Sequence, residues 1–227
     1  MNKKISEIVK RGKTIFKSKI KWILALILLT GCIYGSYTLS RYEAERRIMP
    51  KEKFSIIYAD PPWRYEQKNR QGSAELHYPT MSIEEICSLP VADLAAKDSV
   101  LFLWATFPQL PEALKVIKAW GFSYRSVAFV WIKRNRRSYS WFYGLGYWTR
   151  GNAEICLLAV KGHPKRKSTG VHQLIVSPIE RHSKKPDEAR RKIVELMGDI
   201  PRVELFAREK KPGWDVWGNE VESTVNL

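Results

Sequence analysis

Cysteine and histidine are scarce in this sequence, which has three cysteines and four histidines in 227 residues. The cysteines are Cys32, Cys87 and Cys156; they are far apart, form no Cys-x-x-Cys pair, and none has a histidine at metal-ligand spacing. A disulfide framework and a zinc site are therefore not indicated, and no metal is expected. So sparse a cysteine content suits a reducing cytoplasm, which is the expected location.

Acidic residues are also few. Lys and Arg number 39 against 23 Asp and Glu, which gives a formal net charge of +16. Eleven of the basic and three of the acidic residues lie in residues 1–50, so about half of the excess is there. Such a balance suits a polyanionic partner such as nucleic acid, although proteins that never bind nucleic acid also carry basic surfaces. The length suits one domain with an appendage.

The first fifty residues form this appendage. Residues 22–39 carry no charge and follow a lysine-rich stretch, as in a membrane-inserting or signal-type segment. Residues 29–32 also resemble a bacterial lipoprotein processing site. Another interpretation is that the natural start is Met49, just before the first expected strand. The sequence thus predicts a basic N-terminal segment over residues 1–48, either a membrane tether or not native, and one compact domain over residues 49–227.

Short apolar runs alternate with helical patterns over that domain. The run 54–59 ends at Asp60-Pro61-Pro62, as a buried strand ends in a rigid turn, and Ser82 with Glu85 resembles a capping box. The alternation predicts an α/β fold whose open, mostly parallel sheet has its functional residues at the carboxyl ends of the strands. The expected strands are 54–59, 100–105, 122–132, 154–160, 174–176 and 202–206, the expected helices 109–120 and 187–197, and the expected loops 64–76, 133–150 and 163–167.

The Asp60-Pro61-Pro62-Trp63 turn has the groups needed to activate an aromatic amine. The exocyclic amino group of adenine is a poor nucleophile because its lone pair is delocalised into the ring. The carboxylate of Asp60 and the carbonyl of Pro61 can accept its N–H bonds, and the two prolines hold both acceptors in position. Trp63 offers a flat face for a base drawn out of its stack. A turn of this composition can also simply end a strand without any catalytic role.

Six segments together resemble the MT-A type methyltransferases, a family of eukaryotic mRNA adenosine methyltransferases and their bacterial and phage DNA-adenine relatives. The segments come in the family's order, between Phe54 and Glu220. They are ADPPW (59–63), HYPTMS (77–82), LFLWAT (101–106), GYWTRGNAEICLLAVKG (146–162), RHSKKPDE (181–188) and VELFARxxxxGWDVWGNE (203–220). The resemblance implies a Rossmann-like methyltransferase sheet with helices on both faces and a permuted motif order, in which the catalytic turn precedes the main cofactor motifs.

The resemblance further implies S-adenosylmethionine as the cofactor. Asp60 would lie near the methionine part of the cofactor, and Lys185 would meet its carboxylate, to which a compact ammonium is suited. The sequence departs from the mRNA enzymes at Glu220, where they have glutamine, and at Lys210, where they have histidine. By the resemblance, the catalytic turn is Asp60, Pro61, Pro62 and Trp63, and the residues around the ribose are Glu204, Arg208, Asn219 and Glu220.

Basic and aromatic residues alternate after the strand expected at 122–132, and a second basic loop follows at 163–167. Charges that follow phosphates beside rings that stack on bases are typical of a nucleic-acid site, although a charge run is more often a solvated face. The expected substrate-binding residues are Trp63, Lys133, Arg134, Arg136, Arg137, Lys165 and Arg166.

The sequence thus favours methyl transfer from S-adenosylmethionine to the exocyclic amino group of adenine in DNA. DNA is favoured over RNA because the small size of the chain and the amino-acid sequences of its motifs resemble those of the bacterial and phage members more closely. The alternatives are an RNA adenine methyltransferase, a non-catalytic nucleic-acid-binding partner of the same fold, and transfer to the amino group of cytosine. Glu154 is open between a site-shaping role and that of an ordinary edge charge. The oligomeric state is not indicated.

Overall fold

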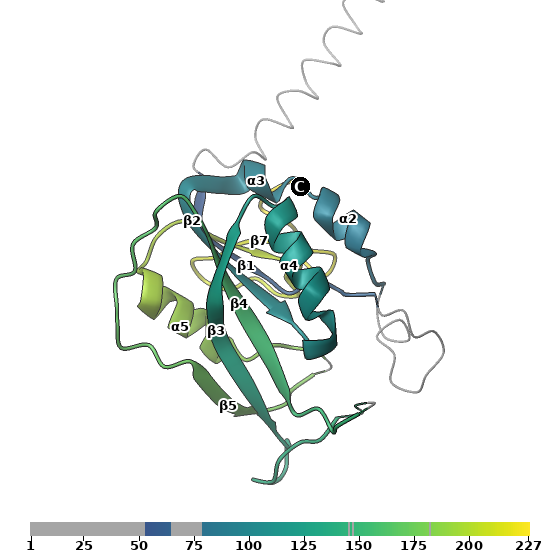
Figure 1. Ribbon diagram of the computed structural model, residues 1–227. Coiled ribbons are helices and arrows are strands. Elements are labelled where there is room, and N and C mark those ends of the chain that lie inside the picture. The colour runs from purple at the N-terminus through teal and green to yellow at the C-terminus, as the bar shows by residue number, and fades with distance from the viewer. Residues whose placement is uncertain (1–52, 65–78, 145, 147, 182) are drawn as a thin grey trace, which may run out of the picture. The chain divides into compact units, whose positions relative to one another are not determined.

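The computed structural model describes residues 53–64, 79–144, 146, 148–181 and 183–227 (Figure 1). The predicted N-terminal segment 1–48, with its apolar stretch 22–39, and nearly all of the predicted loop 64–76 lie outside these residues, so those predictions stay predictions. Within the described ranges, no helix is long and apolar enough to cross a membrane.

In the described part of the chain, seven strands form one sheet in the order β5-β3-β4-β2-β1-β6-β7. Strand β4 is antiparallel to both of its neighbours, β2 and β3, and the other pairs are parallel. The sheet is therefore mostly parallel, as predicted, with one reversed strand. The strands are β1 (Phe54–Ala59), β2 (Ala95–Ala105), β3 (Ser123–Arg134), β4 (Ala153–Lys161), β5 (Leu174–Pro178), β6 (Arg202–Leu205) and β7 (Asp215–Trp217).

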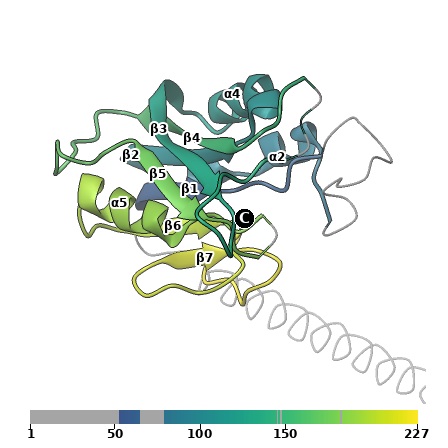
Figure 2. The ribbon, with the colours of Figure 1, turned by 90° about the horizontal axis from the view of Figure 1, so that it is seen from below.

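Helices cover both faces of the sheet, which confirms that part of the expected fold (Figure 2). Helices α2 (Ile83–Ser88), α3 (Val91–Leu94) and α4 (Leu110–Ala119) pack on one face, and α5 (Asp187–Met197) packs on the other. The central strands are apolar at successive positions because both of their faces are buried.

Strand β1 illustrates this double burial. Ile57 and Ala59 belong to the core under α2 and α4, whereas Ile56 and Tyr58 belong to the core under α5. The residue that follows Ala59 therefore leaves the sheet at the carboxyl edge, between two packed layers. Asp60 occupies that position.

Several predicted element ends agree closely with the structure. Strand β1 and helix α5 have the predicted bounds, and α2 begins with the predicted capping box, in which Ser82 and Glu85 bond each other's backbone. Helix α4 is preceded by a 3-10 turn (Phe107–Gln109) and ends before Gly121, whose φ of +78° favours glycine.

Other elements differ from the prediction. Strand β2 begins five residues earlier than the expected 100–105, and β3 extends to Arg134, so the start of the expected loop 133–150 belongs to a strand. Helix α3 and strand β7 were not predicted. Strand β7 has three residues, of which only Val216 is buried, and so short a segment shows no alternation in sequence.

Candidate active site

Asp60 and the prolines form a turn that is pinned to the start of helix α2. The N–H of Trp63 donates to the carbonyl of Pro61 at 2.9 Å, and the N–H of Met81 donates to the carbonyl of Pro62 at 2.9 Å. The N–H of Arg64 in turn donates to the carbonyl of Met81 at 3.1 Å. The Pro61 carbonyl thus already accepts one hydrogen bond, and its second lone pair is left for another donor.

Trp63 is a packing residue in this structure. Its side chain is only 5% exposed, and its Nε1–H donates to the carbonyl of Trp104 at 3.1 Å. The ring lies in the core beneath α2 and α4, so it has little open surface on which a base could stack. The stacking face predicted for Trp63 is therefore corrected to an anchoring role, in which the indole fixes the Asp60 turn against strand β2.

Lys185 joins the Asp60 turn to strand β4. Its Nζ donates to Asp60 Oδ2 at 2.8 Å and to the carbonyl of Ser183 at 3.2 Å, and it lies 3.3 Å from Glu154 Oε2. The other oxygen of Glu154 accepts a hydrogen bond from the ammonium of Lys133, at the end of β3. The four side chains therefore form an ion-pair chain in the order Lys133, Glu154, Lys185, Asp60, with alternating charge. Glu154 is therefore paired inside this group of charges, and its role in shaping the site stays a prediction.

Burial and neighbouring charges act against each other along this ion-pair chain. Burial raises the pKa of the Asp60 carboxyl, and the ammonium of Lys185 opposes that rise. Burial would also raise the pKa of Glu154, but Lys185 and Lys133 outweigh it and lower that pKa. Burial would lower the pKa of Lys185, yet Asp60 and Glu154 raise it above its ordinary value. Each charge therefore depends on its neighbour to remain ionised away from water.

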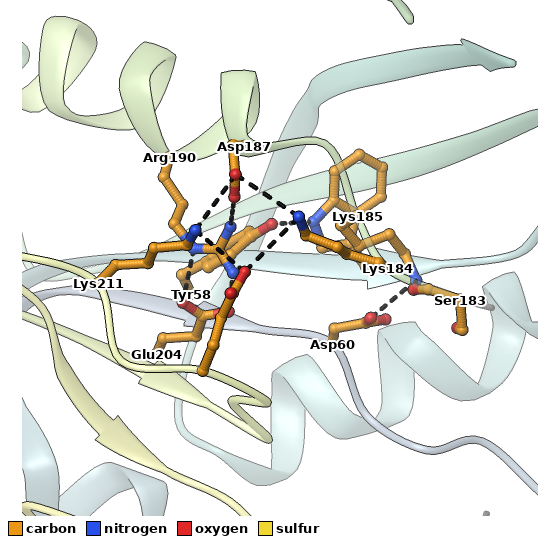
Figure 3. A network of polar contacts seen from close by, with 11 residues as sticks. Tyr58, Asp60, Ser183, Lys184, Lys185, Asp187, Arg190, Glu204 and Lys211 are labelled. Atoms are coloured by element: carbon orange, nitrogen blue, oxygen red, sulfur yellow. Dashed lines mark hydrogen bonds and ion pairs between the residues drawn. The ribbon is translucent and has the colours of Figure 1, made fainter. Parts of the chain in front are cut away.

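A second network of charged side chains lies beside the ion-pair chain, on the α5 face of the sheet (Figure 3). Arg190 of α5 makes a bidentate pair with Glu204 of β6, at 2.7 and 2.5 Å, and its third nitrogen bonds Asp187 at 2.5 Å. The guanidinium also lies 5.5 Å from the ring centre of Tyr58. Burial raises the pKa of Glu204, and Arg190 opposes that rise. Both oxygens of Glu204 are thus engaged by the protein itself.

The two networks border one pocket, which has about 530 Å³ of empty space when its open mouth is included. Its wall brings together most of the residues that the sequence predicted around the cofactor. Asn219 is not among the lining residues and is exposed. The wall consists of Tyr58, Asp60, Arg181, Ser183, Lys184, Lys185, Arg190, Glu204, Phe206, Arg208, Glu209 and Glu220.

Two residues of the pocket wall have unusual backbone conformations. Ser183 and Phe206 both have φ of +59°, and they are the only non-glycine residues with positive φ in the described ranges. Phe206 follows strand β6 directly, and its ring packs against Trp217 at 5.2 Å between centres. At the mouth, Arg208 Nε donates to Glu220 Oε1 at 2.8 Å. Strained residues of this kind cluster at functional sites, where the surrounding structure holds them.

The predicted substrate-binding residues other than Trp63 divide into three groups, of which the first lies at the end of β3, at the carboxyl edge of the sheet. Arg136 and Arg137 are exposed and follow β3 at the carboxyl edge of the sheet. Arg134 stacks on Trp141, with 4.4 Å between the guanidinium carbon and the ring centre. Nearby, the side chain of Tyr139 is 91% exposed. Among the described residues, this group thus offers exposed charge and an exposed ring that a large ligand can contact.

Lys133 forms a group of its own. Its side chain is 17% exposed and is paired with Glu154, so the structure places it inside the site and not on the phosphate-facing surface predicted for it.

Lys165 and Arg166 lie at the opposite edge of the sheet from Asp60. The reversed strand β4 carries the chain to that edge, where the N–H of His163 donates to Asp98 Oδ1 at 2.7 Å. The N–H of Lys167 then donates to the carbonyl of Leu196, at the C-terminal end of α5, at 2.7 Å. The structure therefore does not bring this second basic loop to the candidate site. The sequence suggested otherwise because it does not show the direction of a strand.

Arg190 and Tyr58 are site residues that the sequence reasoning missed. Asp187 and Arg190 are three positions apart on a predicted helix, which indicates a salt bridge. Nothing in that spacing indicates that Arg190 faces Glu204. Within the described residues, no group of three or more His, Cys, Asp or Glu side chains could hold a metal ion.

Comparison with known proteins places this site in a family. The family model MT-A70 matches residues 54–220. The Type II methyltransferase M.MunI of Mycoplasma sp. is 33% identical over 193 residues, which are 76% of this chain and 80% of that protein. The human N(6)-adenosine-methyltransferase catalytic subunit METTL3 is 31% identical over 174 residues, which are 75% of this chain and 28% of that protein.

A further animal relative, the N(6)-adenosine-methyltransferase MT-A70-like protein of Drosophila melanogaster, is 32% identical over 174 residues, which are 75% of this chain and 27% of that protein. The chain thus spans about a quarter of the two animal relatives but most of the bacterial one. The family match includes the Asp60 turn, the ion-pair chain and every residue of the pocket wall. This chain belongs to the MT-A70 family.

Proposed function

We propose that this protein transfers a methyl group from S-adenosylmethionine to the N6 amino group of adenine in DNA. The observation that carries the proposal is the position of Asp60, whose carboxylate ends a buried strand at the wall of a charged pocket and is held there by Lys185. Membership of the MT-A70 family supports methyl transfer to adenine, and the relatives' names support the N6 position.

The pocket wall fits the chemistry of S-adenosylmethionine. The methionine end of that cofactor carries a carboxylate and an ammonium, and the wall offers the ammonium of Lys185 beside the carboxylate of Asp60. Phe206 adds an apolar side chain to the charged wall. When bound, S-adenosylmethionine supplies an electrophilic methyl group on a positively charged sulfur.

Asp60 has the geometry needed to orient an amino group. Lys185 binds Oδ2, so Oδ1 can accept one amino hydrogen, and the second lone pair of the Pro61 carbonyl can accept the other. These bonds favour the pyramidal nitrogen, whose lone pair is directed at the methyl donor. Because the turn is pinned to Met81 and Trp104, the acceptors do not need to reorganise during the reaction.

DNA is the proposed substrate because the bacterial relative, a Type II methyltransferase, matches over 80% of its own length. The exposed arginines and aromatic rings after β3 supply positive charge and stacking surface at the carboxyl edge of the sheet, where Asp60 also lies. RNA is the second candidate, since several relatives are named N(6)-adenosine-methyltransferases at 30–32% identity. Both substrates require a compartment that also holds the cofactor, which supports the predicted cytoplasmic location.

The test is a transfer assay on the full chain, with isotope-labelled S-adenosylmethionine and unmethylated DNA and RNA of matched sequence. Nucleoside mass spectrometry of the products identifies the modified base. We expect N6-methyladenine in DNA. Methyladenine in RNA alone would move the substrate to the second candidate, methylcytosine would change the target base, and cofactor binding without any transfer would favour a non-catalytic binding partner.

A further inference from the structure

Lys133 is a charged residue that turns into the protein at the base of an otherwise exposed basic segment. Its ammonium lies 5.0 Å from the ring centre of Trp131, on the face of the sheet that α5 covers, and bonds Glu154. Arg136 and Arg137, a few residues further on, are exposed. Lys133 therefore differs from its basic neighbours in what it contacts, although the sequence alone groups them together.

Glu154 divides its two oxygens between two lysines. Oε1 is bonded by Lys133 and Oε2 is paired with Lys185 at 3.3 Å, and the carboxylate is only 13% exposed. Lys185 has three hydrogens and three oxygen partners, which are Asp60, Glu154 and the carbonyl of Ser183. The position of Lys185 between Asp60 and Glu154 therefore depends on how strongly each carboxylate attracts it.

We propose that Lys133 is a positioning residue, which acts through Glu154 to hold Lys185 against Asp60, and that it is not a phosphate contact. The proposal rests on the proposed function, because Asp60 is the group whose placement matters. Neither Lys133 nor Glu154 lines the pocket, whereas Lys185 and Asp60 do. Lys133 thus reaches the pocket only through its partner.

The physical argument is a balance of charges around Glu154. The charged groups that face this carboxylate are Lys133 from β3, Lys185 from the segment before α5, and Asp60 from the turn after β1. Cys156, on the same strand, is a neutral thiol, because burial raises its pKa well above the ordinary value. Without Lys133, Oε1 of Glu154 is left buried and unpaired, so Glu154 competes with Asp60 for the ammonium of Lys185.

The loss of Lys133 also has a defined effect on pH dependence. Lys185 and Lys133 together lower the pKa of Glu154 against the effect of burial. Lys185 also opposes the rise that burial causes in the pKa of Asp60. When Glu154 draws Lys185 away, the pKa of Asp60 rises, so Asp60 becomes protonated at a higher pH as the solution is acidified. The acid limb of the kcat profile should therefore move to higher pH.

The experiment compares Lys133→Met with Lys118→Met, which removes an exposed lysine of α4 on the other face of the sheet. We expect Lys133→Met to lower kcat roughly 10- to 100-fold, to leave the KM for DNA within about two-fold, and to shift the acid limb upward. Lys133→Arg, which keeps the charge, should recover much of kcat. Lys118→Met should keep the wild-type kcat and pH profile.

A double-mutant cycle tests whether Lys133 acts through Glu154. In a Glu154→Gln background, Lys133→Met should have little further effect on kcat, because the partner through which it acts has lost its charge. Thermal melts of all variants report whether each one is folded, so a loss of structure is recognised as such.

Three results would overturn the proposal. A higher KM with a weaker salt dependence of DNA binding and an unchanged pH profile would make Lys133 a phosphate contact. A lower melting temperature with unchanged kcat and profile would make its role structural only. Additive losses in the cycle would exclude action through Glu154.

Failure of the proposed function gives a different result. If the wild type transfers no methyl group, calorimetry with S-adenosylhomocysteine still tests the inference, because weaker binding by Lys133→Met than by Lys118→Met would report a displaced Lys185. Equal binding would overturn the inference.

Discussion

The two sides of the candidate site are built in opposite ways. On the α5 side, Arg190 fills both oxygens of Glu204 and bonds Asp187, and Lys185 has an oxygen partner for each of its hydrogens. On the side that follows β3, aromatic residues are turned to solvent, and the side chain of Trp148 is 92% exposed. The inner side is preorganised and the outer side is open.

This difference matches what the two proposed ligands need. A small zwitterionic cofactor is bound best by a wall whose charges are already compensated and held in place. A nucleic acid is long and variable, and exposed cations and rings can follow its phosphates and bases. The inner side should therefore be sensitive to single substitutions, and the outer side should respond gradually.

The largest expected effect is at Asp60. Asp60→Asn keeps the shape of the side chain but removes the negative charge that orients the amino group, so we expect transfer to fall by about 1000-fold or more. Single-turnover kinetics would measure the loss, and calorimetry with S-adenosylhomocysteine would show whether the pocket is intact. If Asp60→Asn transferred methyl groups at the wild-type rate, Asp60 would have no part in the mechanism. The inner side would then be no more sensitive to substitution than the outer side.

The next effect is on stability. Arg190→Met leaves the carboxylate of Glu204 buried without its partner, which should lower the free energy of unfolding by about 3 kcal/mol. Arg191→Met is the matched control, because the neighbouring side chain is two-thirds exposed and its ion pairs are on the surface. The control should change stability by less than about 0.5 kcal/mol. Urea denaturation measures both, and equal values would contradict a preorganised inner wall.

The smallest effect separates the two basic segments. Replacement of Arg136 and Arg137 by Gln should raise the KM for DNA roughly three- to ten-fold and reduce the salt dependence of binding, with kcat little changed. The same double replacement at Lys165 and Arg166, at the opposite edge of the sheet, should have a clearly smaller effect. Fluorescence anisotropy at several salt concentrations compares the two. Equal losses would show that DNA also contacts the far edge.

The sequence predicts those parts of the fold that depend on local patterns. Helix α5 is bounded by a proline and by Gly198, and β1 is an apolar run that ends at a proline turn, so both were found with correct ends. Strand β7 has three residues and depends on pairing with β6, which no local pattern reveals. The short strand therefore escaped prediction.

The same limit applies to the candidate site. Asp60 and Lys185 were predicted as site residues because each lies in a contiguous motif; both line the pocket, and their roles stay predictions. Lys133 and Lys165 were both assigned to the substrate because charge is visible in a sequence and direction is not. The register of β3 on β4 pairs Trp131 with Glu154, which turns Lys133 inward, and the reversal of β4 takes Lys165 away. The locations of Lys133 and Lys165 in the fold thus depend on pairing between strands that are distant in sequence.

The reversal of β4 also makes the chain between β3 and β4 the tip of a hairpin at the active edge (Figure 1). The stem of this hairpin carries Lys133 and Glu154, the internal charges of the site, and the tip carries the exposed arginines and aromatic rings. The charged pair in the stem is largely buried and the tip is exposed. Substitutions in the tip should therefore alter the surface of the protein and leave the pair of Lys133 and Glu154 in place.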